Sequence, residues 1–253
     1  MDAWPAAAVL YPRKNNMREE TSGWARRSFL SRLGGGVTAL GAALGARPAA
    51  AQAPGASEGN ARVWQPGRHA EDDWLDQVPG QHRFFFDTAT PAAFGSAIFF
   101  ANNYFTANRS GYGLADGDLA VIICVRHRST PFAYSDAMWA KYGAPIAERS
   151  EFTDPKTKQA PASNAYWSAG YGNLLPNNGV TLEAMIKRGV RLAVCQMATR
   201  AYAVTIAGKI GGNADEIYKE LTEHLVPNAH MVPAGIVAVN RAQEHGYSFA
   251  YAG

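Results

Sequence analysis

Short apolar runs alternate along the chain with stretches of helical periodicity. Residues 82–87 and 117–125 are compact and apolar, and the second run is continuous, which is typical of a parallel strand covered on both faces. In residues 247–251, side chains of different polarity alternate, as is typical of an edge strand. The pattern predicts five strands, at residues 82–87, 117–125, 190–195, 230–232 and 247–251.

Helical segments separate these strands, and several of them carry end signals. Thr90 followed by Pro91 is an N-cap with proline at the first helical position. Thr181 caps a helix that Gly189 ends, and Asn213 begins a capping-box pattern. The predicted helices lie at residues 91–107, 135–142, 181–188, 199–207, 213–225 and 234–245.

Strands that alternate with helices in this way predict a three-layer α/β sandwich around a mainly parallel five-stranded sheet. We place this domain at residues 81–253. An extended lead-in at residues 54–80 precedes it, with one helical turn around residues 73–76. In such sheets, ligands collect at the carboxyl ends of the strands.

Residues 143–179 have no regular pattern and are predicted to form an inserted loop. Loops of this length in a compact domain are usually functional or disordered. The aromatic residues Tyr166, Trp167 and Tyr171 favour a structured loop. Three interpretations stay open for this cluster, namely a lid, a subunit contact and ordinary packing.

The first 53 residues differ in character and predict a twin-arginine export signal. Arg26 and Arg27 are followed by Phe29 and Leu30, which resembles the S/T-R-R-x-F-L-K pattern except at its first and last positions. The glycine-rich residues 33–46 come next. They are too few to span a hydrocarbon core, which needs roughly 20 apolar residues.

Small residues after this stretch allow cleavage after Ala51 or Ala53. We therefore expect export to the periplasm by the twin-arginine pathway and no permanent membrane anchor. The alternative is a flexible basic tail that stays inside the cell. Met17 is a second possible start, because it would shorten the segment before the arginine pair without touching it.

The composition, with 47% hydrophobic and 11% aromatic residues, is that of a globular protein with a sizeable core. Residues 1–53 hold seven of the 24 Lys and Arg and three of the 21 Asp and Glu, which leaves 17 basic and 18 acidic residues. Such a near-neutral surface lacks the clustered positive charge that nucleic acid or anionic lipid requires. We expect neither as a partner.

Cys124 and Cys195 are the two cysteines of the chain. No CxxC, CxxCH or His-rich spacing occurs, and His224 and His230 are isolated, so we expect no cofactor and no metal ion. An oxidising compartment favours disulfides. A strand between the two cysteines would nevertheless hold them too far apart, and we predict no bridge. Cys124 is interpreted as a core residue, with a resolving thiol as the alternative.

Cys195 is the candidate for the reactive group, because it ends a strand just before a helical pattern begins. The unsatisfied amides at a helix N-terminus lower the pKa of a thiol, and Arg200 would add positive charge. Arg126, His127 and Arg128 leave the second strand at the same edge of the sheet and suit a sulfur oxyanion or a thiolate. The alternatives are a buried core cysteine and solvated charges at a strand exit.

Two segments resemble the DsrE/DsrF-like sulfur-relay family. They are the cysteine-bearing strand at residues 189–195 and the closing pattern of helix, Gln243, Gly246, Tyr247 and strand. The resemblance covers about residues 82–253 and implies that Cys195 accepts sulfur as a persulfide. It also implies a partner protein that donates or accepts sulfur, and a homo-oligomer. Two alternative functions stay open. One is a module that binds a small ligand or partner without covalent chemistry, and the other is an oligomeric accessory protein.

Overall fold

The computed structural model describes residues 64–253 and contains one wholly parallel five-stranded sheet. Its spatial order is β4-β3-β2-β1-β5, which confirms the α/β class and the five-stranded sheet. The strands are β1 (His82–Thr88), β2 (Leu119–Val125), β3 (Arg191–Cys195), β4 (Ala229–Val232) and β5 (Ser248–Tyr251). The last strand lies at an edge of the sheet, as its sequence predicts.

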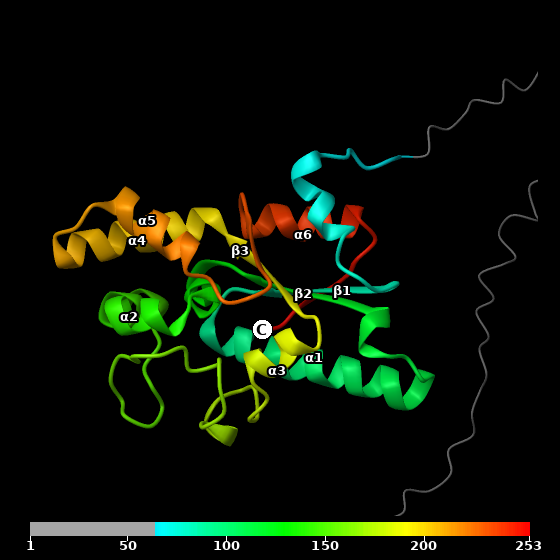
Figure 1. Ribbon diagram of the computed structural model, residues 1–253, viewed down its shortest axis with the longest axis horizontal. Helices are drawn as coiled ribbons and strands as arrows, with labels where there is room; N and C mark the ends of the chain where they lie inside the picture. Colours follow the sequence, from blue (N-terminus) through cyan, green and yellow to red (C-terminus); the bar gives the residue numbers. More distant parts are fainter. Residues whose placement is uncertain (1–63) are drawn as a thin grey trace, which may run out of the picture. The chain divides into compact units, whose positions relative to one another are not determined.

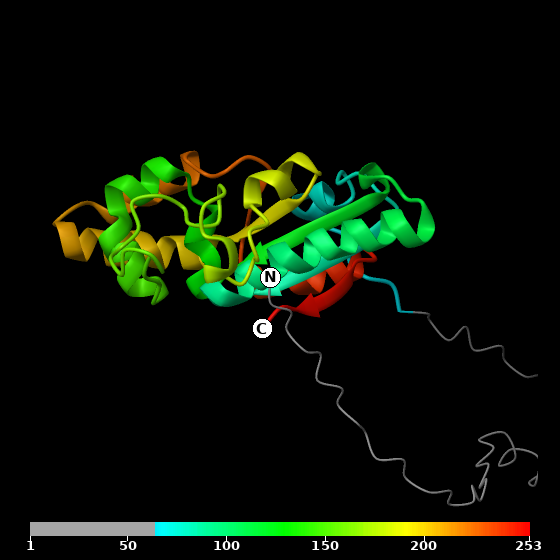
Figure 2. The same cartoon turned by 90° about the horizontal axis from the view of Figure 1, so that it is seen from below.

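Helices cover both faces of this sheet and make it the middle layer of three. They are α1 (Pro91–Tyr112), α2 (Asp136–Ser150), α3 (Leu182–Lys187), α4 (Gln196–Ile210), α5 (Ala214–Glu223) and α6 (Gly235–Glu244), with short 3-10 helices η1 (Ala70–Leu75), η2 (Asp116–Asp118), η3 (His127–Ala133) and η4 (Gly172–Leu174). Figure 1 shows α1 and α3 on one face and α6 on the other. In Figures 1 and 2, α2, α4 and α5 extend beyond the carboxyl ends of the strands.

Each face of the sheet has its own apolar core because side chains alternate along a strand. Val121 and Ile123 of β2 belong to the large core beneath α1, whereas Ala120 and Ile122 belong to the smaller core beneath α6. Every residue of β2 is buried. This confirms that the continuous apolar run is a strand covered on both faces.

Helix α2 is longer than its sequence pattern predicts. A kink at Tyr142 (φ −123°, ψ 15°) coincides with the predicted end, but a second helical segment continues to Ser150. Pro145 lies in the first turn of that second segment, where its missing N–H costs no helical hydrogen bond. The prediction that residues 143–150 are irregular is therefore wrong.

The irregular chain beyond α2 packs through its aromatic residues. Tyr166 is buried in the large core, and its hydroxyl donates to the Pro91 carbonyl at 2.9 Å. Gly95 of α1 makes room for the ring, since a Cβ there would lie 2.7 Å from Tyr166 Cε1. Ordinary packing, one of the three interpretations of the aromatic cluster, accounts for Tyr166.

The expected export signal lies outside the described residues, as does the first part of the lead-in. The described part of the lead-in contains η1, close to the helical turn expected at residues 73–76. Among residues 64–253, no helix combines the length and the apolar character needed to cross a membrane.

Candidate functional site

The chain passes from strand β3 into helix α4 without a loop, and Cys195 is the residue at that junction. Helix α4 begins at Gln196, three residues earlier than predicted, so Cys195 is its N-cap. The Cys195 sulfur accepts a hydrogen bond from the Ala198 amide, with 3.4 Å between Sγ and N. Only 6% of the residue is exposed. The thiol therefore lies at the positive end of the helix dipole.

The turn after β2 is held by buried hydroxyl groups. The Arg126 amide donates to Ser129 Oγ at 3.0 Å, and Thr88 Oγ1 donates to the same oxygen at 2.9 Å. Between them, His127 has a left-handed backbone with φ of 56°. Such a conformation is costly for a residue with a Cβ, and it persists where the surroundings impose it. The turn places the exposed His127 side chain at the carboxyl edge of the sheet.

Arg126 is bound to a buried carboxylate. Its Nε and Nη2 each donate to Asp87 at 2.8 Å, in a bidentate pair at the ends of β1 and β2. The hydrogen bonds with Asp87 raise the pKa of the Arg126 guanidinium. Asp87 is 3% exposed, and its carboxylate neutralises the Arg126 guanidinium. Arg126 therefore forms part of the pocket wall but adds little net positive charge to it.

A second helix N-terminus reaches the same edge of the sheet. Gly235 is the first residue of α6 and packs on β2, where a Cβ would lie 2.6 Å from Arg126 Cβ and 3.1 Å from Cys124 Sγ. The N-cap residue Ala234 has no side chain that could cap the helix. The first amides of α6 therefore have no side-chain cap, which is one condition for anion binding at a helix N-terminus.

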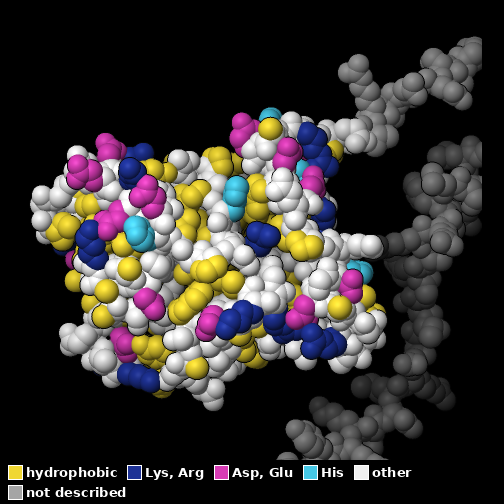
Figure 3. Space-filling model, viewed as in Figure 1, with side chains coloured by type: hydrophobic (Ala, Val, Ile, Leu, Met, Phe, Trp, Pro, Cys, Tyr) yellow, Lys and Arg dark blue, Asp and Glu magenta, His cyan; other side chains and the backbone are white. Residues whose placement is uncertain are grey.

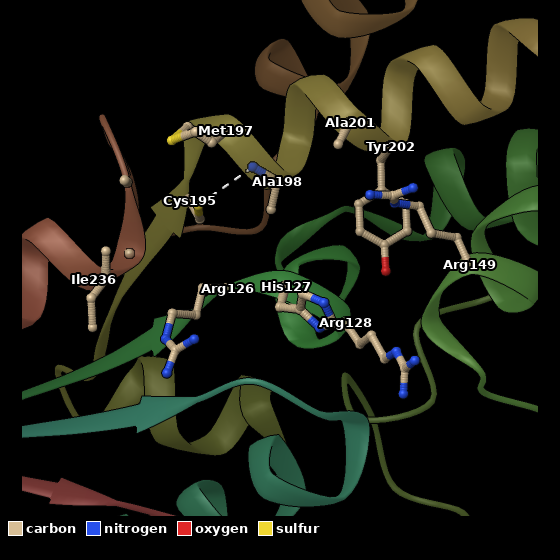
Figure 4. A pocket seen from close by; sticks show the side chains of 12 residues that line it. Arg126, His127, Arg128, Arg149, Cys195, Met197, Ala198, Ala201, Tyr202 and Ile236 are labelled. Carbon is tan, nitrogen blue, oxygen red and sulfur yellow. Dashed lines mark hydrogen bonds between the residues drawn. The ribbon is translucent and has the colours of Figure 1, made fainter.

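These elements enclose a pocket of about 490 Å³ around the Cys195 thiol. Its lining includes Arg126, His127, Arg128, Arg149, Cys195 and Tyr202 together with small and apolar residues of α4 and α6. Figure 4 shows the side chains of Arg126, His127 and Arg128 on the side of the pocket opposite Cys195 and Ala198. The structure thus brings together four residues expected from the sequence, namely Cys195, Arg126, His127 and Arg128.

Arg149 and Tyr202 were not expected from the sequence. The Arg149 guanidinium lies over the Tyr202 ring, 5.0 Å from its centroid, and donates to Thr205 Oγ1 at 2.9 Å. Arg149 belongs to the second segment of α2, which its sequence pattern does not reveal. Tyr202 follows Cys195 by two turns of α4, and that helical spacing is the one available signal.

Arg200, expected near the thiol, lies elsewhere. Its guanidinium forms an ion pair with Asp215 and lies over the Tyr218 ring, 3.9 Å from the centroid. Figure 3 shows acidic side chains gathered over α4 and α5, and Asp215 is one of four acidic residues on α5. Arg200 pairs with Asp215 and is not among the residues that line the pocket, so the structure does not place it beside Cys195 as expected from the sequence.

The two cysteines lie on neighbouring strands, so no strand separates them in the described sheet and the condition considered from the sequence does not apply. Cys124 pairs in register with Ala193, two residues before Cys195. That diagonal separates the Cα atoms by about 8 Å from strand geometry, beyond the roughly 4.4–6.8 Å of a disulfide. Both thiols are free. Burial and the nearby Asp87 charge raise the pKa of Cys124, which is typical of an inert core cysteine.

No protein-family model, curated protein or solved structure matches this chain. Within residues 64–253, no three His, Cys, Asp or Glu side chains come together as a metal site would require. What the pocket offers is one thiol, several cationic side chains and two helix N-termini, a combination suited to a sulfur nucleophile and an anionic reactant.

Proposed function

We propose that the protein is a DsrE-like sulfur carrier in which Cys195 takes up sulfane sulfur as a persulfide and passes it to an acceptor. One observation carries this proposal: the Cys195 sulfur is the N-cap atom of α4 and borders a pocket lined by Arg128, Arg149 and His127. Packing of a cysteine in a core requires neither a helix N-terminus at its sulfur nor a pocket with cationic side chains.

The surroundings of Cys195 hold cationic side chains and the amides of two helix N-termini. Helix N-termini and nearby cations stabilise a thiolate, which is the nucleophilic form of cysteine. A persulfide anion on Cys195 would extend one atom further toward the same cationic lining. A pocket of about 490 Å³ has room for the additional sulfur and for a small donor or acceptor thiol.

The uptake step balances without an external oxidant or reductant. The Cys195 thiolate attacks the sulfane sulfur of the donor and forms a new sulfur–sulfur bond. The bond between that sulfur and the rest of the donor breaks, and the leaving group takes the bonding pair. Release is the same displacement in the other direction, with an acceptor thiolate as the nucleophile.

Export to the periplasm, a partner protein that donates or accepts sulfur, and a homo-oligomer complete the proposal. A lone thiolate in an oxidising compartment is exposed to sulfenic and sulfinic acid formation. The 6% exposure of Cys195 limits that reaction, and a bound sulfur atom would occupy the thiol. Light scattering of the protein tests the oligomer, and a monomer at all concentrations would contradict it.

Intact-mass spectrometry tests the proposal. The protein is reduced, freed of reductant, and incubated in separate reactions with thiosulfate and with cysteamine persulfide. We expect a gain of one sulfur atom per chain in the wild type and in Cys124→Ala, and none in Cys195→Ala. Absence of the gain with both donors, or its persistence in Cys195→Ala, would remove Cys195 as the carrier.

A module that binds a small anion without covalent chemistry is the second candidate, favoured by the cationic lining. In that case Cys195→Ala would retain the ligand and the wild type would gain no sulfur. The same mass measurement, combined with calorimetric titration of sulfate into Cys195→Ala, separates the two functions.

A further inference from the structure

The positive charges around the Cys195 pocket differ in how far carboxylates neutralise them. Arg126 is paired in bidentate fashion with the buried Asp87. Arg128 pairs with Glu151, but both side chains are substantially exposed, at 38% and 62%, so water screens that pair. Among the described residues, Arg149 contacts a hydroxyl and an aromatic ring and has no carboxylate in ion-pair range. Of these three arginines, Arg149 is thus the one whose positive charge no carboxylate neutralises, and it can interact with an anionic ligand.

Tyr202 supplies an independent indication of a missing ligand. The residue is 1% exposed, and its hydroxyl makes no hydrogen bond of good geometry within the described part of the chain, where the Ser150 hydroxyl, which donates to the Ile146 carbonyl, is a neighbour. Figure 4 shows this hydroxyl directed toward the segment that carries His127 and Arg128. Burial raises the pKa of the phenol, while the charges of Arg149 and Arg128 and the Ser150 hydroxyl act in the opposite direction. An unpaired buried hydroxyl is costly unless something binds to it.

Together these groups form one end of the pocket, and the thiol with two helix N-termini forms the other. Arg149, Arg128 and the Tyr202 hydroxyl are hydrogen-bond donors among the residues that line the pocket, and each guanidinium group can match two oxygens of an oxyanion at once. Cys195 borders the same space. A reactant that suits both ends carries an oxyanion group and a transferable sulfur in one small molecule.

We propose that the sulfur donor is a small thiosulfonate-type oxyanion, such as thiosulfate, whose sulfonate oxygens bind Arg149, Arg128 and Tyr202 while its sulfane sulfur faces Cys195. This inference rests on the proposed function and names the class of its donor. The recessed position of the thiol favours a small molecule over a persulfide presented on another protein, which would have to insert a segment of chain into the pocket.

The step is a displacement on the sulfane sulfur. The Cys195 thiolate attacks it, the sulfur–sulfur bond of thiosulfate breaks, and sulfite leaves with the bonding pair. The products are the Cys195 persulfide anion and sulfite, so charge and electrons balance. Arg149 and Arg128 stabilise the negative charge that grows on the departing sulfite, which is where preorganised donors accelerate a reaction.

Two donors and one variant test this assignment. Loading of Cys195 is timed by intact mass with thiosulfate and with cysteamine persulfide, which carries sulfane sulfur and no oxyanion. We expect Arg149→Gln to slow loading by thiosulfate about ten- to hundred-fold, the usual range for a lost charge-assisted hydrogen bond, and to slow loading by cysteamine persulfide much less, because that donor has no oxyanion for Arg149 to bind. Arg149→Lys should fall between the wild type and Arg149→Gln, because it keeps the charge and loses the planar fork.

Controls separate this inference from the proposed function. Lys187→Gln removes an equally charged but remote side chain, in an exposed pair with Glu183, and should load like the wild type. Sulfate should compete with thiosulfate in the wild type and much less in Arg149→Gln. Equal slowing of both donors in Arg149→Gln, or wild-type loading by cysteamine persulfide alone, would overturn the thiosulfonate assignment and leave the carrier intact. Wild-type loading by neither donor would end both.

Discussion

Cys124 and Cys195 point to the same face of the sheet, but only Cys195 borders the pocket. Cys124 lies wholly buried beneath Gly235, and burial raises its pKa. Cys195 lies two residues further toward the carboxyl edge and receives the Ala198 amide. A displacement of about 7 Å along a strand therefore separates an inert core thiol from one placed for chemistry.

The Arg126 and Asp87 pair should contribute strongly to stability, because Asp87 is buried. Asp87→Asn leaves the guanidinium without its counter-charge, and we expect the free energy of unfolding to fall by about 3 kcal/mol. Urea denaturation measures this loss. Arg200→Gln, which breaks an exposed pair with Asp215, serves as the comparison and should cost less than about 1 kcal/mol. Similar losses in the two variants would contradict the structural role of Asp87.

At this scale the sequence identified part of the site. Cys195, Arg126 and His127 could be predicted because each stands at the end of an apolar run, where parallel strands expose their carboxyl ends. Arg149 could not, because its helical segment follows a kink and contains Pro145, and the local pattern does not show which distant helix borders a pocket. Arg200 was misplaced because nothing in the sequence indicated that Asp215 would bind it.

At the scale of single elements, the exact start of α4 matters most. The sequence predicted a helix from Thr199, since Gln196, Met197 and Ala198 carry no recognised cap. The structure begins the helix at Gln196, so that the thiol itself occupies the N-cap. The hydrophobic pattern of a sequence predicts the ends of a helix less accurately than its existence, because the competing conformations of a terminal turn differ little in energy.

The N-terminus of α6 depends on Gly235, and its substitution should damage both fold and site. In Gly235→Ala the added Cβ would lie 2.6 Å from Arg126 Cβ, which forces α6 or the arginine to move. We expect a loss of about 1–3 kcal/mol, as for other overpacked positions, and slower sulfur loading of Cys195. Chemical denaturation and intact mass provide the two measurements.

Gly208→Ala is the matched control for this change. Gly208 lies within α4 and a Cβ there would meet no atom within 4 Å. We expect this variant to gain about 0.5–1 kcal/mol, because alanine is the better helix former. A loss of the same size in both variants would show that the close contact at Gly235 is unimportant.

For the whole molecule, the alternation of strands and helices was enough to predict the fold class. Each apolar run such as β2 needs cover on both faces, and right-handed crossovers through helices provide it. The order of the strands was not predictable from pattern, because runs of similar composition can exchange places in a sheet. Whether a third strand separates Cys124 from Cys195 could for this reason be stated from the sequence only as a condition, and in the structure their strands are neighbours.

The export signal is a prediction about the whole chain, made from residues outside the described structure. Replacing the pair with lysines, Arg26→Lys with Arg27→Lys, should retain the unprocessed protein in the cytoplasm, because the twin-arginine pattern is lost while the charge is kept. Fractionation of cells and the mass of the N-terminus measure the outcome. Normal processing of the double variant after Ala51 or Ala53 would contradict this route.

A complete cycle of sulfur uptake and release tests the central claim most directly. The wild type is loaded with cysteamine persulfide, freed of donor, mapped by peptide mass, and then treated with an excess of a small acceptor thiol. We predict one added sulfur atom per chain, located on Cys195, and a return to the original mass when the acceptor takes it. Sulfur found on Cys124, no sulfur on Cys195, or added mass that the acceptor cannot remove would contradict a carrier role for Cys195.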